Sequence, residues 1–183
     1  MQFIESELPG AYVIELERHL DERGFFARSY CEREFREHGL PDRFPQCNLS
    51  RNNKCGTLRG MHFDAPPSAE CKLVRCVSGA VYDVILDLRP GSSTRFRWTG
   101  VQLSAENGRA LFVPAGFAHG FLTLTDASDV FYHMGDFFKP ETARGFRWDD
   151  PYFGITWPSA PVVISERDAG YSDFDPGLFE AER

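Results

Sequence analysis

The sequence predicts an all-β protein, a β-sandwich or small barrel with one or two short helices. Short apolar runs separated by Gly, Pro and Asn follow one another from about Gln46 to Trp157, a pattern typical of many short strands joined by turns. The chain has 183 residues without a repeat or linker, so we expect one domain over residues 1–183. A barrel of this size can hold one small ligand among its inward-facing side chains.

Two elements are clear from the residue pattern. The segment from Glu32 to His38 reads as a helix, because Gly39 and then Pro41 supply its stop signals. The run Val81–Leu88 reads as a strand with alternating faces. Its first face carries Tyr82, Val84, Leu86 and Leu88, and its second carries Val81, Asp83, Ile85 and Asp87. The acidic segment after Tyr171 is a weaker candidate for a second short helix.

Composition excludes some classes of function. The formal net charge of -7 disfavours a general nucleic-acid binder, which would show a basic face. No apolar run approaches the roughly 20 residues of a membrane span. The cysteines Cys31, Cys47, Cys55, Cys71 and Cys76 contain no C-x-x-C pair. We therefore expect free thiols, a cytoplasmic location and neither nucleic-acid nor membrane partners.

A partial cupin motif lies around His119. The spacing Gly108-x5-Pro114-x-Gly116-x2-His119 resembles the second signature of the cupin barrels. The first signature, a His-x-His pair with a Glu, is incomplete because Asp64 follows His62 where a second His would stand. Two His and a carboxylate can still hold non-haem iron. A metal-dependent cupin enzyme is therefore an alternative, although we expect no metal and no cofactor.

The order and spacing of several segments resemble the dTDP-4-dehydrorhamnose 3,5-epimerase family, cupin-type jelly-roll proteins that use no metal. These segments are Asp21–Phe26, Gln46–Ser50, Leu58–His62, Lys72–Cys76, Pro114–Phe121, Trp148–Pro151 and Ser165–Asp168. The resemblance implies an isomerase that inverts C3, C5 or both in a nucleotide-linked 4-keto-6-deoxy sugar, with dTDP as the expected nucleotide. Such epimerases serve deoxysugar biosynthesis, for surface glycans or secondary metabolites.

The implied chemistry requires an acid, a base and a cation. The C4 ketone acidifies the hydrogens at C3 and C5, so removing one gives an enolate, and reprotonation from the other face inverts the carbon. By resemblance, His62 is the base and Asp168 orients it, as in other His–Asp pairs. Tyr132 is implied as the acid, and Lys72 as the group that stabilises the enolate oxygen.

The resemblance also implies substrate-binding residues and a homodimer. His119 is expected to hold the sugar, and the diphosphate is expected to contact Arg59, Gln46, Asn48 and Arg167. Arg23 is expected to reach the nucleotide from a neighbouring subunit by exchange of the N-terminal segment. Phe26 and Phe138 complete the substrate-binding residues.

Structural interpretations compete with these roles. His119 and Tyr132 are also compatible with core positions, Lys72 with a strand-edge charge and Asp168 with a cap or turn. In a regular strand, Arg59 and His62 would face opposite sides. A bulge at Gly60 would turn both towards the cleft.

Several positions depart from the family pattern. Arg28 stands where many members carry Glu, and Phe63-Asp64 replaces the common Tyr-Gln pair. Phe137-Phe138 replaces a frequent Tyr-Tyr, and Cys71 replaces Ala. The carboxylate of Asp64 would disfavour a nearby diphosphate unless it is paired or turned away. These departures leave open a 3-only or 5-only epimerase of another keto-sugar nucleotide, and a non-catalytic sugar-nucleotide binding module.

Overall fold

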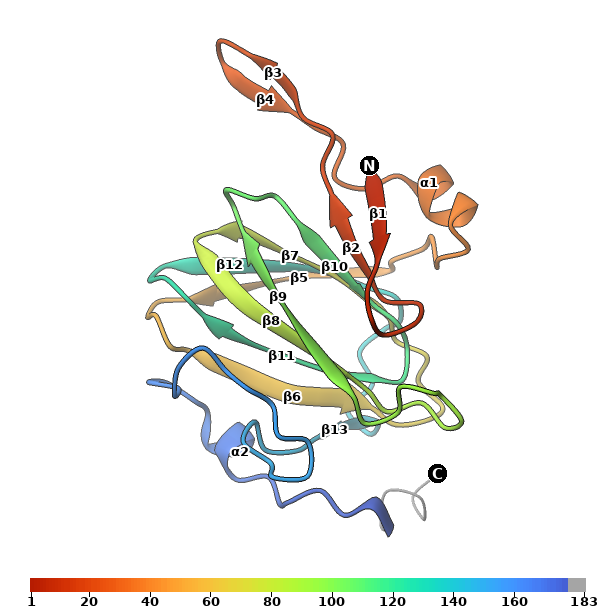
Figure 1. Ribbon diagram of the computed structural model, residues 1–183, viewed down its shortest axis with the longest axis vertical. Coiled ribbons are helices and arrows are strands. Elements are labelled where there is room, and N and C mark those ends of the chain that lie inside the picture. Colours follow the sequence, from red (N-terminus) through yellow and green to blue (C-terminus); the bar gives the residue numbers. More distant parts are fainter. Residues whose placement is uncertain (178–183) are drawn as a thin grey trace.

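The computed structural model describes residues 1–177, and all but two of its strands form two antiparallel sheets that face each other (Figure 1). The six-stranded sheet has the order β1–β2–β10–β7–β12–β5, whose bounds are Gln2–Glu5, Tyr12–Glu15, Ala110–Val113, Lys72–Ser78, Ser128–Met134 and Gln46–Asn52. The five-stranded sheet has the order β13–β6–β11–β8–β9, whose bounds are Ala143–Gly145, Leu58–Asp64, Phe117–Thr123, Ala80–Asp87 and Trp98–Ser104. The predicted all-β jelly roll is confirmed.

The core lies between the two sheets and follows the predicted alternation of the strand Val81–Leu88. Val81 and Ile85 of β8 point into the barrel, where they pack with Val74 of β7 and Val130 of β12. Asp83 shares this inward face, and it is fully buried. The barrel interior therefore carries a buried charged group from a strand that is otherwise apolar.

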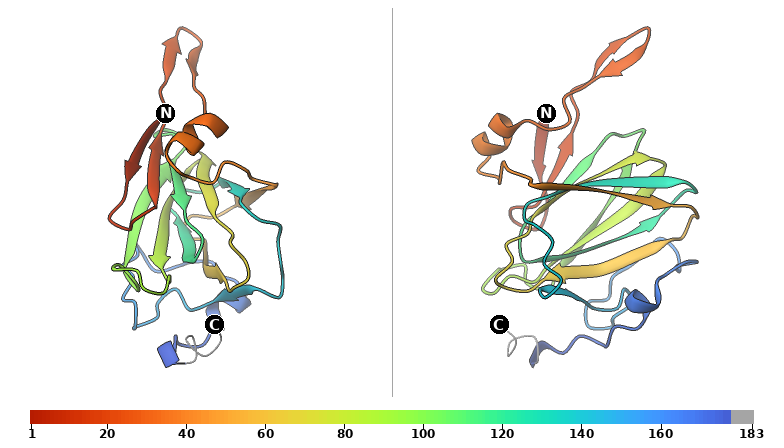
Figure 2. Two further views of the ribbon diagram at one scale, coloured as in Figure 1. Left: turned by 90° about the vertical axis from the view of Figure 1, so that its right-hand side faces the viewer. Right: turned by 180° about the vertical axis from the view of Figure 1, so that it is seen from behind.

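Other segments cover the outer faces of the sheets. Helix α1 (Glu32–Glu37) lies where it was predicted, and its buried Phe35 packs on Leu73 and Phe112 of the six-stranded sheet. The chain after β13 covers the five-stranded sheet, with Phe146 and Phe153 in one cluster with residues of β6 and β8. Figure 2 shows both coverings from two further sides.

A second short helix, α2 (Glu166–Ala169), precedes Tyr171, and the sequence pattern did not predict it. The helix expected after Tyr171 falls in a segment that lies partly outside the described residues. None of the helices within residues 1–177 has the length and apolar character of a membrane span.

The N-terminal region contains a two-stranded antiparallel arm, formed by β3 (His19–Asp21) and β4 (Gly24–Phe26). The arm projects away from both sheets (Figures 1 and 2). Its apolar side chains Leu20, Phe25 and Phe26 are all exposed. An arm with this surface buries little of its apolar area within its own chain.

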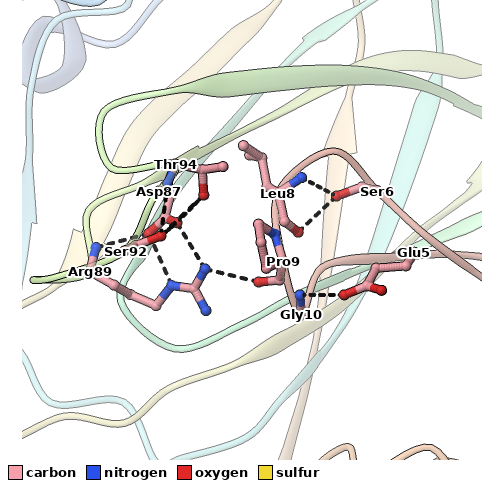
Figure 3. Close-up of polar contacts among 9 residues, drawn as sticks. All are labelled: Glu5, Ser6, Leu8, Pro9, Gly10, Asp87, Arg89, Ser92 and Thr94. Carbon is pink, nitrogen blue, oxygen red and sulfur yellow. Dashed lines mark hydrogen bonds and ion pairs between the residues drawn. The ribbon is translucent and has the colours of Figure 1, made fainter.

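A buried carboxylate, Asp87, lies at the centre of a hydrogen-bond network near the β1–β2 turn (Figure 3). Asp87, at the end of β8, accepts hydrogen bonds from Arg89, from the Ser92 hydroxyl at 2.6 Å and from the Thr94 hydroxyl at 2.8 Å. Arg89 also donates to the carbonyl of Pro9 at 2.9 Å, which ties this loop to the β1–β2 turn. Burial alone would raise the pKa of Asp87, but these hydrogen bonds outweigh it and lower the pKa to about 2.

Candidate active site

A pocket of about 270 Å³ opens between the two sheets. Its lining comes from β5, β7 and β12 on one side and from β6 and β11 on the other. The lining residues are Asn48, Ser50, Arg59, His62, Lys72, His119, Phe121, Tyr132 and Met134. Most of the residues expected to act on the sugar are therefore gathered in one cavity.

A β-bulge in β6 turns Arg59 and His62 to the same side. His62 pairs with His119 of β11, whereas Arg59 pairs with Phe121, so β6 spans three residues where β11 spans two. Gly60 lies inside this bulge with φ of 118°. A Cβ at Gly60 would come within 2.6 Å of the Gly120 Cα, so only glycine fits. The bulge expected at Gly60 is therefore present.

His62 is held by the carboxylate of Asp168. Nε2 of His62 lies 2.8 Å from Oδ1 of Asp168, and the amide of Gly60 donates to the other carboxylate oxygen at 3.1 Å. Ser165 caps α2 by accepting a hydrogen bond from the Asp168 amide. Burial would raise the pKa of Asp168, but the hydrogen bond and charge of His62, with Gly60 and Ser165, lower it overall. Asp168 is therefore a stable anion that can orient an imidazole.

Tyr132 enters the pocket from β12, in the sheet opposite the one that carries His62. Its ring lies 6.2 Å from the ring of His119 and 6.5 Å from that of Phe121, measured between centroids. Burial, together with the charge of Asp83, raises the pKa of Tyr132 far above its usual value, although the charge of Arg59 opposes this. The phenol is therefore neutral and carries its proton.

His119 forms a second pair, with Asp83 deep in the barrel. Its Nε2 lies 2.9 Å and 3.0 Å from the two oxygens of Asp83, and both side chains are buried. Burial raises the pKa of Asp83, against the charge and hydrogen bond of His119. Nε2 of His119 therefore bonds to Asp83, while the His119 side chain also lines the pocket.

Lys72 lies on β7 between two carboxyl groups. Its Nζ is 2.5 Å from Oε1 of Glu70 and 3.7 Å from Oδ2 of Asp64. Asp64 also accepts a hydrogen bond from the Thr142 hydroxyl at 3.1 Å. The Asp64 carboxylate, which departs from the family pattern, is therefore paired rather than free to repel an anion.

A second hollow of about 360 Å³ adjoins the pocket and shares Arg59 and His62 with it. Arg167 and Asp168 of α2 line this hollow as well. Nε of Arg59 donates to Asn52 at 2.8 Å, and Nε of Arg167 donates to the Tyr171 hydroxyl at 2.9 Å. Two guanidinium groups therefore border a space next to the sugar-sized pocket.

The remaining predicted residues lie farther out. Gln46, at the start of β5, accepts a hydrogen bond from the Phe138 amide at 2.6 Å, and the ring of Phe138 is exposed. Arg23 and Phe26 are on the projecting arm and do not line the pocket of their own chain. The Arg23 side chain is 85% exposed and pairs with Asp21.

The sequence pattern did not predict three residues that the structure places at or beside the site, namely Ser50, Glu70 and Asp83. For Asp83 a signal existed, because an aspartate on the inward face of an apolar strand needs a buried partner. For Glu70 the signal was its spacing, two residues before Lys72 on an extended chain. Ser50 gave no signal beyond its place in a strand with Asn48. Within residues 1–177, no three His, Cys, Asp or Glu side chains are grouped as a metal site would require.

The fold and this acid–base arrangement define a class, the cupin-type jelly-roll isomerases that move protons on a carbohydrate. Sequence comparison makes the assignment specific, because the sequence model of dTDP-4-dehydrorhamnose 3,5-epimerase matches residues 5–175. The chain belongs to the dTDP-4-dehydrorhamnose 3,5-epimerase family, and it is a sugar epimerase. The predicted family and enzyme class are confirmed.

Individual relatives agree with this assignment. The dTDP-4-dehydrorhamnose 3,5-epimerase of Methanothermobacter thermautotrophicus is 46% identical over 173 residues, covering 93% of this chain and 92% of that protein. The 3,5-epimerase of Legionella pneumophila, solved in complex with dTDP-4-keto-L-rhamnose, matches with a TM-score of 0.85 and 38% identity, covering 91% of this chain and 89% of that one. ChmJ, a 3'-monoepimerase from Streptomyces bikiniensis solved with dTDP-quinovose, matches with a TM-score of 0.83 and 33% identity. The match covers 89% of this chain and 83% of the ChmJ chain.

Proposed function

We propose that this enzyme inverts both C3 and C5 of a dTDP-linked 4-keto-6-deoxy sugar, by way of enolates. The observation that carries the proposal is the placement of His62, with its carboxylate, and of Tyr132 on opposite walls of one pocket. Inversion needs a base on one face of the sugar and an acid on the other. The names and bound ligands of the relatives support a dTDP-sugar as the substrate.

In the proposed mechanism, His62 removes the proton from C3 or C5. Its Nε2 donates to Asp168, so Nδ1 is the nitrogen that accepts the proton, and the carboxylate stabilises the imidazolium that results. The ammonium of Lys72 stabilises the enolate oxygen. Tyr132 then donates its proton to the opposite face of the same carbon. Solvent returns a proton to the phenolate and takes one from the imidazolium, so the overall reaction is an isomerisation.

The surroundings of Tyr132, His119 and the two arginines are compatible with these proposed roles. A phenol whose pKa is raised by burial stays protonated until the enolate forms, and the nearby Arg59 charge favours the phenolate that remains. His119 would hold the sugar beside Tyr132. The hollow bordered by Arg59 and Arg167 would hold the diphosphate, with Asn48 and Gln46 on the pocket side.

We propose a homodimer in which the arm completes the pocket of the partner subunit. Arg23 and Phe26 reach no pocket of their own chain, and the arm exposes Leu20 and Phe25 beside them. The outer face of the six-stranded sheet also exposes Leu49 and Val77. Exposed apolar groups of this kind favour association.

We also propose that residues 1–183 form one domain and that the enzyme works in the cytoplasm. The continuous contacts among the sheets support one domain. All the cysteines named above are free, including the exposed Cys47 and Cys55. Exposed free thiols persist best in a reducing compartment.

The proposal is tested by incubating the enzyme with dTDP-4-keto-6-deoxyglucose in D₂O and following the sugar hydrogens by NMR. We expect exchange at C3 and C5, and a loss of about 10³-fold in His62→Asn, because a general base is removed. His38→Asn changes an exposed histidine at the C-terminal end of α1, outside the pocket, so it is the matched control and should exchange at the wild-type rate.

The other outcomes are equally informative. Exchange at one carbon alone would keep the mechanism and show a single-centre epimerase like ChmJ. Binding of the compound without exchange would contradict the epimerase assignment for this substrate and favour a binding module. Undiminished exchange in His62→Asn would contradict the assignment of the base.

A further inference from the structure

The ammonium of Lys72 is enclosed by acidic groups that the reaction itself does not require. Glu70 is the nearer partner at 2.5 Å, and its side chain is only 5% exposed. Asp64 lies at 3.7 Å and is itself fixed by the buried Thr142 hydroxyl. Such a buried cluster costs desolvation energy, so it calls for a reason beyond surface charge.

Glu70 is the nearest charged partner of Lys72. It lies two residues before Lys72, the first residue of β7, and the two side chains form an ion pair at 2.5 Å. Lys72 itself pairs with Met134 of β12 and Val113 of β10, which offer no charge. Asp64 of β6 lies on another side of Lys72. The other charged or titratable side chains that line the pocket with Lys72 are Arg59, His62, His119 and Tyr132.

Glu70 interacts with both charged neighbours in the cluster. Burial raises the pKa of Glu70, the charge and hydrogen bond of Lys72 oppose this, and the charge and hydrogen bond of Asp64 raise it again. The contact with the Lys72 ammonium is therefore the interaction that favours the charged form of the Glu70 carboxyl.

We propose that Glu70 is a positioning residue for epimerisation, which holds the Lys72 ammonium at the pocket wall where the enolate oxygen develops. This inference rests on the proposed function, because Lys72 is there assigned to the enolate. Lysine is a flexible point charge on a four-carbon stem, so its place must be fixed by partners. Without Glu70 the Lys72 ammonium is free to turn towards Asp64 or towards the diphosphate. It is then no longer held beside the carbonyl oxygen of the substrate.

The first test is a double-mutant cycle with Glu70→Gln and Lys72→Met, assayed by the same deuterium exchange and by steady-state kinetics. We expect Glu70→Gln to lower kcat by roughly 10- to 100-fold with KM within about twofold, because misplacing a catalytic charge costs this much. In the Lys72→Met background, Glu70→Gln should have no further effect. Glu141→Gln, an exposed carboxylate on the neighbouring β12–β13 connection, is the matched control and should retain the wild-type kcat.

Wild-type kcat in Glu70→Gln, or an equal further loss in the Lys72→Met background, would overturn the inference. The second pattern would show a structural role for Glu70 that does not pass through Lys72. Glu70→Asp should recover part of kcat, since it restores the carboxylate on a shorter stem.

A second test does not depend on turnover. The ¹⁵N resonance of the Lys72 amine, assigned by its absence in Lys72→Met, is titrated with pH in wild type and in Glu70→Gln. Losing an adjacent carboxylate lowers the pKa of an amine. We therefore expect the titration midpoint of the Lys72 amine to be lower in Glu70→Gln than in wild type, and to be unchanged in Glu141→Gln. An unchanged midpoint would overturn the inference. If wild-type enzyme exchanges no substrate hydrogen, the proposed function fails, while this titration still decides whether Glu70 controls Lys72.

Discussion

Two histidines line the same pocket, and each is paired with a carboxylate at a nearly equal distance, 2.8 Å for His62–Asp168 and 2.9 Å for His119–Asp83. Their surroundings differ. The His62 side chain is 43% exposed, whereas that of His119 is 7% exposed. The pKa of Asp168 is lowered by its hydrogen bonds, whereas burial raises the pKa of Asp83.

The difference matches the two roles proposed above, a base for His62 and a sugar-holding group for His119. The His62 ring is accessible to solvent, and the Asp168 anion is stable enough to support an imidazolium. Asp83 and most of the His119 side chain are buried, where ionisation is expensive. A short His–Asp distance alone therefore does not identify a catalytic base, and the exposure of the ring decides.

The largest effect in this comparison is expected for Asp168→Asn. The amide keeps the size of the side chain but cannot stabilise the imidazolium, and it can hold the wrong imidazole tautomer. We expect kcat to fall by roughly 10²- to 10⁴-fold, with deuterium exchange at C3 and C5 falling in parallel. Rates within about threefold of wild type would remove the distinction between the two pairs.

A smaller effect is expected for Asp83→Asn. Its amide oxygen still accepts the hydrogen bond from His119, so the pocket keeps its shape, and we expect at most about a tenfold loss in kcat/KM, mainly through KM. In Asp83→Leu the buried imidazole is left without its partner, and we expect a loss of about 1–3 kcal/mol in the free energy of unfolding. Denaturant titration measures it. A larger kcat loss in Asp83→Asn than in Asp168→Asn would reverse the assignment of the two pairs.

The smallest effect on catalysis is expected for Asp87→Asn, on the same strand as Asp83. Asp87 is as buried as Asp83 but is ion-paired, and its pKa is lowered to about 2. Because the folded protein binds this proton less tightly than the unfolded chain, Asp87 stabilises the fold above about pH 4, and this contribution is lost as the pH falls towards 2.

We expect Asp87→Asn to lower the free energy of unfolding by about 2 kcal/mol at pH 7, with kcat unchanged. The difference from wild type should shrink between about pH 4 and 2, as measured by urea denaturation across this range. A pH-independent difference would show that the ion pair with Arg89 contributes through packing rather than through charge.

The sequence predicted the elements whose patterns are local. The alternation of Val81–Leu88 gave the correct inward face of β8, and Gly39 with Pro41 marked the end of α1. The family motifs brought the correct side chains to one pocket, including His62, Lys72 and Tyr132. These features depend on neighbours along the chain or on spacing that the family shares.

The rest depends on contacts between distant segments. Glu70 and Asp64 meet at Lys72 only because β6, β7 and the loop between them fold back together. The partner of His119 is Asp83, 36 residues earlier in the chain. Strand periodicity left the direction of His62 open, since it depends on an irregularity in pairing with β11. Helix α2 is too short for a periodic signal, and the Ser165 cap defines it.

The bulge in β6 also predicts how this enzyme tolerates change in chain length. Since one extra residue in β6 sets Arg59 and His62 on the same wall, a single-residue deletion between them would rotate one of the two into the opposite layer of side chains. Every residue type in the pocket would survive such a deletion, yet the proposed base and the proposed phosphate-binding guanidinium would no longer face the same cavity. In lineages of this enzyme, this segment should therefore keep its length.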